Sequence, residues 1–377
     1  MKEISLYVHI PFCKQKCLYC DFPSYASLEM LMDDYVDALS KEIEEKGKGY
    51  LIKSIFIGGG TPSYLSESQI KRVLDSINKL NKAKDIEFSM ECNPGALEEE
   101  KLKTMLLGGV NRISMGLQAR QDSLLKTLGR IHTFDEFVEN FNLARKIGFN
   151  NINVDLMFGL PNQKLEDWIE TLETIVKLKP DHISAYSLII EEGTCFYNMY
   201  NNNKLRLPSE EEEREMYAIT KDILSVHGYH QYEISNYSKE GCECLHNKIY
   251  WECKPYLGLG ASASSFVDGY RFKNLDNVKE YVRRIKLNED VIDEKIKNSI
   301  EDNIEEFMFM GVRLIDGISK EEFKVRFGRD VNSIYKEIIA KNIKAGLLEE
   351  DNKKLRLTSK GIELSNIVMS DFILDSK

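Results

Sequence analysis

The first half of the 377-residue chain alternates strand-like and helix-like segments, and this alternation restricts the fold more than any other feature. The strand-like runs end near Ile10, Ile57, Met90, Leu117, Phe158 and Ile189. Helix-like segments lie between them, at about 28–46, 67–80, 98–107, 121–128 with 134–147, and 164–178. Repeated βα units predict a parallel sheet. The sequence therefore predicts an α/β fold with an open, partial (β/α)6 barrel, about three-quarters of a TIM barrel.

Two of the expected helices begin with recognisable capping residues. Ser66 precedes Glu67-Ser68-Gln69, and Thr133 precedes Phe134-Asp135-Glu136. A hydroxyl at the cap accepts an N–H of the first turn, while the acidic or amide side chain three residues later reaches back to the cap. These residues predict helix starts at positions 67 and 134.

The pattern changes after about residue 200, so we expect three parts: a barrel over 1–200, an α+β extension over 201–290 and a helical domain over 291–377. In the extension, Tyr232–Tyr237 is strand-like and Tyr256–Gly260 is a glycine-rich turn. The last part begins with a long amphipathic run, Ile300–Val312. Expected helices at Ser319–Phe327 and Val331–Ala345, followed by a hairpin over Leu347–Leu357, predict a winged-helix-like module.

Composition places the chain among globular proteins without a nucleic-acid surface. Hydrophobic residues make up 42% and charged residues 30% of the sequence. The formal net charge is −10, and the basic residues form no stripe, which argues against nucleic-acid binding. No apolar run approaches the ~20 residues of a membrane span, and the chain starts directly in a strand. We expect a cytoplasmic protein whose eight cysteines are reduced.

Three of those cysteines lie in the loop after the first strand. Cys13, Cys17 and Cys20 have C-x3-C-x2-C spacing. Thiolates bind iron–sulfur clusters, and a cubane of four irons normally takes four of them. Three close thiolates therefore favour a cluster with one open iron, where a small molecule can bind. A zinc site and three unrelated thiols are the alternatives, but zinc sites usually have four ligands, and no fourth ligand follows Cys20.

Further candidate residues follow the later strands, at the barrel end where such folds carry their chemistry. The run Gly58-Gly59-Gly60-Thr61-Pro62-Ser63 follows the second strand, and glycines let backbone approach a ligand closely. Glu91 ends the third strand. Polar residues also end or follow the fourth and fifth strands: Gln118, Arg130 and Asp155. Each of these polar residues, taken alone, could equally be a capping or solvated group. Their ordered occurrence at successive strand ends favours a ligand-binding site.

The cysteine loop resembles the signature of the radical S-adenosylmethionine superfamily, C-x3-C-x-aromatic-C. The resemblance implies that Cys13, Cys17 and Cys20 bind a 4Fe-4S cluster. In that superfamily the open iron chelates the methionine end of S-adenosylmethionine, and an electron from the cluster cleaves the sulfonium to a 5′-deoxyadenosyl radical. By the same resemblance, the aromatic Tyr19 packs against the adenine.

The resemblance also implies roles for the residues at the strand ends. The loop residues Gly59, Gly60 and Thr61 match the family's GGGTP loop, which holds the methionine end of the cofactor. Glu91 matches the carboxylate that accepts the ribose hydroxyls. The remaining expected S-adenosylmethionine contacts are Tyr7, Gln118, Arg130 and Asp155.

A second motif resembles one branch of this superfamily, the HemW haem chaperones of porphyrin metabolism. His246-Asn247-Lys248-Ile249-Tyr250-Trp251 matches the H-N-x-x-Y-W pattern of that branch. Phe22 stands where the related oxygen-independent coproporphyrinogen III dehydrogenase has a further cysteine. One departure concerns Gly260-Ala-Ser-Ala-Ser-Ser-Phe266, because many relatives have Gly-Ala-His there.

His246 is the expected haem ligand, because a neutral imidazole is a common axial ligand of haem iron. Tyr250 and Trp251 would supply flat apolar surface for the macrocycle. The alternative is that His246 caps a loop and the two aromatic residues belong to the core.

Three functions remain open at this point. The resemblance favours a haem chaperone that transfers haem to respiratory haem proteins, membrane-bound ones included. The alternatives are radical decarboxylation of coproporphyrinogen III and radical chemistry on another substrate. Neither a bound nucleic acid nor a membrane span is expected, and the cluster could promote a homodimer.

Four residues in the extension form a further candidate site. Cys242, Cys244 and His246 have C-x-C-x-H spacing, and Cys253 follows. Such a set could bind a soft metal or share in haem binding. It is not part of the family pattern, and close cysteine spacing on a loop also arises by chance.

Overall fold

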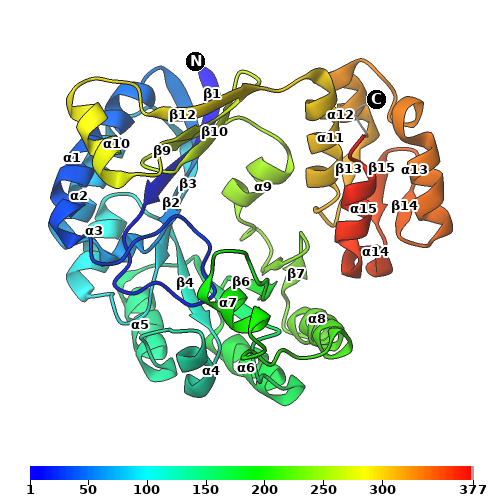
Figure 1. Cartoon of the computed structure of the whole chain (residues 1–377), viewed down its shortest axis with the longest axis horizontal. Coiled ribbons are helices and arrows are strands. Elements are labelled where there is room, and N and C mark those ends of the chain that lie inside the picture. Colours follow the sequence, from blue (N-terminus) through cyan, green and yellow to red (C-terminus); the bar gives the residue numbers. More distant parts are fainter. Residues whose placement is uncertain (375–377) are drawn as a thin grey trace.

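The computed structural model describes residues 1–374. Six parallel strands form the centre of its main sheet and are paired in chain order. Their bounds are β1 Lys2–Ile10, β2 Tyr50–Gly59, β3 Lys82–Cys92, β4 Arg112–Gln118, β5 Ile152–Phe158 and β6 His182–Ser187. The helices that cover them are α1 Met32–Lys46, α2 Glu67–Asn78, α3 Glu99–Leu107, α4 Asp122–Thr127, α5 Phe134–Ile147 and α6 Leu165–Leu178. This arrangement confirms the partial (β/α)6 barrel (Figure 1).

The expected helix caps are present. Ser66 Oγ accepts the Gln69 N–H, and Thr133 Oγ1 accepts the Glu136 N–H, each within a reciprocal capping box. The carboxyl ends of the strands lie within two residues of the sequence expectation. Apolar residues of the strands and of the inner helix faces form one continuous core. Local capping and burial of the core therefore favour the same boundaries for the βα units.

The sheet continues on both sides of these six strands. Its full order is β12-β11-β10-β9-β1-β2-β3-β4-β5-β6-β8-β7. The added elements are α7 Cys195–Asn201, α8 Glu210–Val226, β7 His230–Gln231, β8 Asn236–Ser238, α9 Leu245–Trp251, β9 Tyr256–Leu259, β10 Ser264–Val267, β11 Tyr270–Asn274, α10 Val278–Lys286 and β12 Ile292–Lys297. Residues 201–290 thus share a sheet and a core with the barrel.

Two local expectations in this region are wrong. The glycine-rich segment Tyr256–Gly260 is not a turn: β9 pairs in parallel with β1, and only Gly260 leaves the strand, with φ +102°. The segment Tyr232–Tyr237 is not one strand, because it turns between the short antiparallel strands β7 and β8. The partner of β9 is distant in sequence, and β8 pairs with the distant strand β6 as well as with its neighbour β7, so pairing and not local residue preference decided the outcome.

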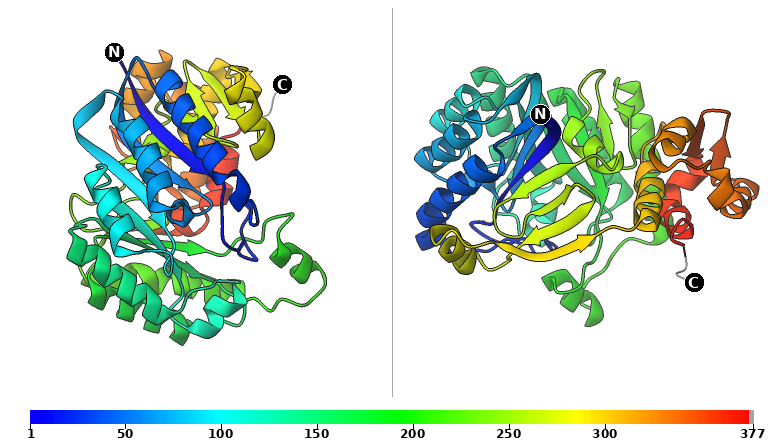
Figure 2. Two further views of the ribbon diagram at one scale, coloured as in Figure 1. Left: turned by 90° about the vertical axis from the view of Figure 1, so that its left-hand side faces the viewer. Right: turned by 90° about the horizontal axis from the view of Figure 1, so that it is seen from above.

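The C-terminal module has its own core and a three-stranded sheet, β13-β15-β14. Its elements are α11 Ile300–Gly311, β13 Ile318–Ser319, α12 Lys320–Phe327, α13 Asn332–Lys344, β14 Leu348–Glu350, β15 Lys354–Leu357, α14 Ser359–Glu363 and α15 Ser365–Asp371. The order helix, strand, two helices and hairpin is that of a winged-helix-like module. Figures 1 and 2 show it beside the open side of the barrel, with α9 between the two.

Specific contacts tie this module to the barrel. The Ile315 N–H donates to the Tyr232 carbonyl at 3.0 Å. The Arg271 guanidinium on β11 makes a bidentate pair with Glu306 on α11, with both N–O distances 2.6 Å. Bidentate pairs of this kind fix orientation as well as distance. Among the described residues, no helix has the length and apolar character needed to cross a bilayer.

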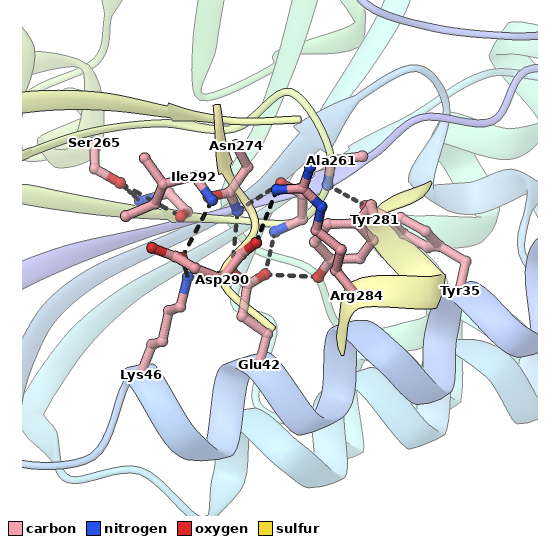
Figure 3. A network of polar contacts seen from close by, with 12 residues as sticks. Tyr35, Glu42, Lys46, Ala261, Ser265, Asn274, Tyr281, Arg284, Asp290 and Ile292 are labelled. Atoms are coloured by element: carbon pink, nitrogen blue, oxygen red, sulfur yellow. Dashed lines mark hydrogen bonds and ion pairs between the residues drawn. The ribbon is translucent and has the colours of Figure 1, made fainter. Parts of the chain in front are cut away.

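A buried carboxylate on α1 joins the barrel to the extension (Figure 3). Glu42 is fully buried and accepts three hydrogen bonds: from the Gly260 N–H at 2.8 Å, Asn274 Nδ2 at 2.9 Å and the Tyr281 hydroxyl at 2.6 Å. Lys46 Nζ lies 3.0 Å from the same carboxylate. A Cβ at position 260 would lie 2.6 Å from the Tyr35 hydroxyl and 2.7 Å from the His9 carbonyl, so this position requires glycine.

We expect Glu42→Ala to lower the free energy of unfolding by about 3 kcal/mol or more, because it leaves three buried donors and a lysine without their acceptor. Chemical denaturation of the variant and wild type measures the difference. Glu45→Ala, at an exposed position of the same helix, is the matched control. Equal losses in the two variants would contradict the importance of the buried network.

Candidate cofactor site

The three-cysteine loop lies against the glycine loop at the carboxyl ends of β1 and β2. The Gly60 N–H donates to the Ile10 carbonyl at 2.8 Å, and the Thr61 N–H donates to the Phe12 carbonyl at 2.8 Å. The Cys13 N–H donates to the Tyr25 carbonyl at 3.0 Å. Both ends of the cysteine loop are therefore held by backbone bonds, with Cys13 buried and Cys17 and Cys20 partly exposed.

Each thiol has a polar neighbour. The Thr61 hydroxyl donates to Cys13 Sγ at 3.5 Å, Arg130 donates to Cys17 Sγ at 3.6 Å, and Cys20 Sγ lies 4.0 Å from Ser24 Oγ. Burial raises the pKa of the Cys13 and Cys20 thiols above the ordinary value. Bound iron overcomes such a shift because it binds the thiolate form. The hydrogen-bond donors would then stabilise the negative sulfur atoms of a cluster.

The glycine loop fits tightly against its neighbours. A Cβ at Gly59 would lie 2.5 Å from the His9 ring, and one at Gly60 would lie 2.8 Å from the Phe12 carbonyl and 3.0 Å from Cys13 Sγ. Gly59 also has φ +113°. Only glycine allows this backbone to lie directly beside the cysteine loop. The fit supports a bound group that contacts both loops.

Glu91 and Tyr7 lie beside this loop, inside the barrel. Glu91 Oε2 accepts the Gly59 N–H at 3.0 Å. Burial, and then the nearby Asp155 carboxylate, raise the Glu91 pKa to about 8. The Tyr7 hydroxyl lies 2.9 Å from His9 Nδ1, and His9 Nε2 lies 2.8 Å from the Pro23 carbonyl. Since a carbonyl only accepts, Nε2 carries the proton, and the Tyr7 hydroxyl donates to Nδ1.

Residues of β4 and β5, and Arg130 after α4, lie in the same region. Asp155 is in the middle of β5 and does not end or follow it, in contrast to the expectation from the sequence. Arg130 NH2 donates to the Gly116 carbonyl and, at 3.0 Å, to Asn93 Oδ1. Gln118 ends β4 with φ +77°, a conformation uncommon outside glycine. Asp155 accepts from Ser114 Oγ at 2.9 Å and Asn153 Nδ2 at 2.7 Å, and burial raises its pKa.

Part of this region forms a cavity of about 360 Å³. Cys17, Thr61 and Arg130 from the expected set line it, together with Lys14, Gln15, Tyr64, Asn93, Pro94, Gly95, Ala96, Gly129, Ile131, His132 and Glu136. Tyr7, Glu91, Gln118 and Asp155 do not line it; they lie on the strands or at their carboxyl ends. Tyr19 is half-buried, and its ring centroid lies 6.5 Å from that of Phe196 on α7.

Two lining residues were missed from the sequence. Asn93 donates to Thr61 Oγ1 at 2.9 Å and accepts from Arg130, so it connects the glycine loop to the arginine. His132 Nε2 is buried without a partner among the described residues. Burial, and then Arg130, lower the His132 pKa to about 3. Asn93 directly follows β3, and His132 lies two residues after Arg130. These positions in the sequence could have indicated that both residues belong to the site.

His246 is not exposed in this fold. It lies on α9 and is 1% exposed. Its Nδ1 lies 2.9 Å from Ser54 Oγ and its Nε2 lies 2.9 Å from the Tyr250 hydroxyl. Burial lowers its pKa to about 3, so the ring is neutral. Binding of haem iron by His246, as expected from the sequence, therefore requires that the ring give up one of these bonds and become accessible.

The candidate soft-metal set of Cys242, Cys244, His246 and Cys253 does not assemble. Within residues 1–374, no group of three or more His, Cys, Asp or Glu side chains is arranged to hold a metal ion. Cys244 Sγ instead faces Glu87 Oε1 at 3.6 Å, in the interior. Of the two alternatives, chance spacing therefore holds for these residues, because Cys244 precedes α9 and turns inward. The three-cysteine loop differs from such a site, because a cubane spreads its thiolates over several irons.

Two family models match the barrel and the C-terminal module separately. Residues 7–175 match the model of the radical SAM superfamily, and residues 299–364 match the HemN C-terminal domain. The chain is 41% identical over 375 residues to the heme chaperone HemW of Bacillus subtilis, covering 98% of this chain and 99% of the relative. It is 39% identical over 383 residues to HemW of Lactococcus lactis, covering 99% and 98%.

A solved structure shares the whole fold. Coproporphyrinogen III oxidase (HemN) of Escherichia coli superposes with a TM-score of 0.86 at 24% identity, covering 99% of this chain and 90% of that one. The barrel and its cysteine loop define a radical SAM protein. Within that superfamily, the chain belongs to the HemW family of heme chaperones.

Glu91→Gln should change how stability depends on pH. The Glu91 pKa is about 8 in the folded chain, against an ordinary value of 4.5. Unfolding therefore releases a proton between these values, and wild type loses stability as pH rises through that window. Glutamine stays neutral and can still accept the Gly59 N–H. We expect the variant, compared without cofactor, to match wild type below pH 4.5 and to gain relative stability up to about pH 8.

Denaturant titrations at pH 4.5, 6 and 8 measure this difference. An advantage of the variant that stays constant across the three pH values would contradict the raised pKa of Glu91.

Proposed function

We propose that this protein is a haem chaperone that binds a 4Fe-4S cluster, S-adenosylmethionine and haem, and that transfers haem to other proteins. The observation that carries the proposal is similarity over nearly the entire chain to the heme chaperone HemW of Bacillus subtilis. A fitting cofactor site at the carboxyl ends of the strands supports it.

In this proposal Cys13, Cys17 and Cys20 bind the cluster. When bound, an open iron of the cluster chelates S-adenosylmethionine and supplies the electron that can cleave it. Gly59, Gly60 and Thr61 present backbone to the methionine end of the cofactor, and Tyr19 packs against the adenine. Glu91 accepts the ribose hydroxyls, and the remaining contacts come from Tyr7, Gln118, Arg130 and Asp155.

The proposed acceptors are respiratory haem proteins, including membrane-bound ones, and the proposed location is the cytoplasm. Homodimer formation upon cluster binding belongs to the same proposal. Light scattering of the protein with and without its cluster tests this point: an unchanged mass would remove the dimer from the proposal.

The second candidate is radical decarboxylation of coproporphyrinogen III. The observation in its favour is the fold shared with coproporphyrinogen III oxidase of Escherichia coli. Against it stands Phe22, which is 62% exposed in the cysteine loop where the related dehydrogenase has a further cysteine. A chaperone that converts no substrate does not need this further cysteine.

Anaerobic reconstitution followed by two assays separates the candidates. We expect saturable binding of one haem per chain, read from its absorption, and no conversion of coproporphyrinogen III in the presence of S-adenosylmethionine and reductant. Steady product formation would overturn the chaperone proposal, and so would the absence of haem binding.

Replacing Cys17 with serine should abolish the cluster, because serine does not replace a thiolate as an iron ligand at this site. We expect the iron content after reconstitution to fall from about four per chain to near zero. Cys195→Ser is the matched control, since Cys195 is exposed and lies on α7, outside the three-cysteine loop. Full iron retention in Cys17→Ser, or an equal loss in both variants, would contradict the assignment.

A further inference from the structure

A cavity of about 460 Å³ lies between the barrel extension and the C-terminal module. Its volume lies within the range of about 300–1,000 Å³ typical of ligand pockets. The extension contributes His230, Gln231, Tyr232, Glu243, Lys248, Trp251 and Glu252. The module contributes Phe307, Gly311, Leu314, Ile315, Asp316, Gly317, Ile318, Ser319, Glu322, Lys354 and Arg356. We call this cavity the interdomain cleft.

Much of its wall is aromatic or apolar. Trp251, the last residue of the H-N-x-x-Y-W motif, lines the cleft, whereas His246 does not. The guanidinium of Arg313, which is not part of the cleft wall, stacks on the Trp251 ring at 4.4 Å and fixes its plane. Trp251 Nε1 is buried and has no partner within the described residues. The cleft thus offers a flat aromatic ring.

The cleft also contains an accessible imidazole. Of the six histidines, His9, His132, His182 and His246 are buried. His227 is exposed, and its Nδ1 is occupied by the Ile223 carbonyl at 2.9 Å. His230 is exposed, lines the cleft, and makes no side-chain hydrogen bond among residues 1–374. Its backbone is fixed by pairing between β7 and β8. Either nitrogen of its ring is therefore available to a metal.

Charged side chains complete the lining: the cations Lys248, Lys354 and Arg356, and the carboxylates Glu243, Glu252, Asp316 and Glu322. Each cation is paired with an acidic neighbour: Lys248 with Glu243, Lys354 with Asp316, and Arg356 with Glu349. Such surface pairs contribute little, about 0–1 kcal/mol. An anionic ligand can therefore replace the acidic partner of one of these cations with little loss of free energy.

We propose that the interdomain cleft is the haem site, with His230 as the axial ligand, Trp251 against the macrocycle and Lys354 facing a propionate. This inference rests on the proposed function and specifies where it takes place. The same part of the chain supplies an open imidazole for the iron, an aromatic face for the macrocycle and cations for the propionates. His246 positions α9, and with it Trp251, through its bonds to Ser54 and Tyr250.

The test is haem titration of the reconstituted full chain, read from the Soret band. We expect His230→Ala to lower haem affinity at least tenfold and to shift the Soret maximum. His227→Ala, three residues earlier and outside the cleft, should leave both unchanged. His230→Gln separates ligation from packing, because it keeps a polar side chain and should lose haem like the alanine variant. Circular dichroism confirms that each variant is folded.

Two charge-reversal variants test the cleft independently of the iron ligand His230. Lys354→Glu should weaken haem binding several-fold, whereas Lys353→Glu, next to it and outside the cleft wall, should not.

Two results would overturn the proposal in distinguishable ways. If wild type binds haem and His230→Ala keeps the same affinity and spectrum, the cleft assignment fails while the chaperone function stands. If wild type binds no haem, the proposed function fails and the cleft assignment with it.

Discussion

The arrangement of the second half depends on one buried carboxylate, that of Glu87. It lies on β3 and accepts the N–H of Leu245 at 2.8 Å and the N–H of His246 at 3.0 Å. These are amides at the start of α9, which have no partner within the helix. The bond fixes a helix of 7 residues inside the curve of the sheet. Because α9 contacts both β2 and α11, the position of the C-terminal module also depends on this anchor.

The same helix takes part in a row of packed rings that begins at Tyr7 on β1 and ends at Tyr256 on β9. Neighbouring aromatic rings run from the barrel interior to the module side, with centroid separations of 6.5, 5.4, 5.2 and 4.7 Å along Tyr7, Phe56, His246, Tyr250 and Tyr256. Arg271 then donates to the Tyr256 hydroxyl at 3.2 Å and pairs with Glu306 on α11. The H-N-x-x-Y-W motif thus serves as a structural connector whose last residue reaches the cleft.

The sequence predicted well wherever the determining interactions are local. The capping boxes at Ser66 and Thr133 and the alternating βα pattern placed the barrel elements within a few residues. The order of motifs along the strands indicated a candidate site, and Cys17, Thr61 and Arg130 from that set line one cavity. Prediction failed where distant chain segments decide. The partner of β9 is β1, some 250 residues earlier. Cys244 turns toward Glu87 rather than toward Cys242, and His246 is enclosed by Ser54 and Tyr250. No spacing rule carries such information.

The open sheet ends in two very different strands. On one side, β7 has only two residues, so it offers almost no backbone to a further strand. On the other, β12 has the sequence Ile-Asp-Glu-Lys-Ile-Lys and is mostly exposed. A long free edge invites pairing with other chains, and charged side chains on it oppose such pairing. The barrel stays open at its side and so leaves room for the C-terminal module and the interdomain cleft. The charged edge strand β12 and the very short edge strand β7 oppose the aggregation that such an open sheet would otherwise risk.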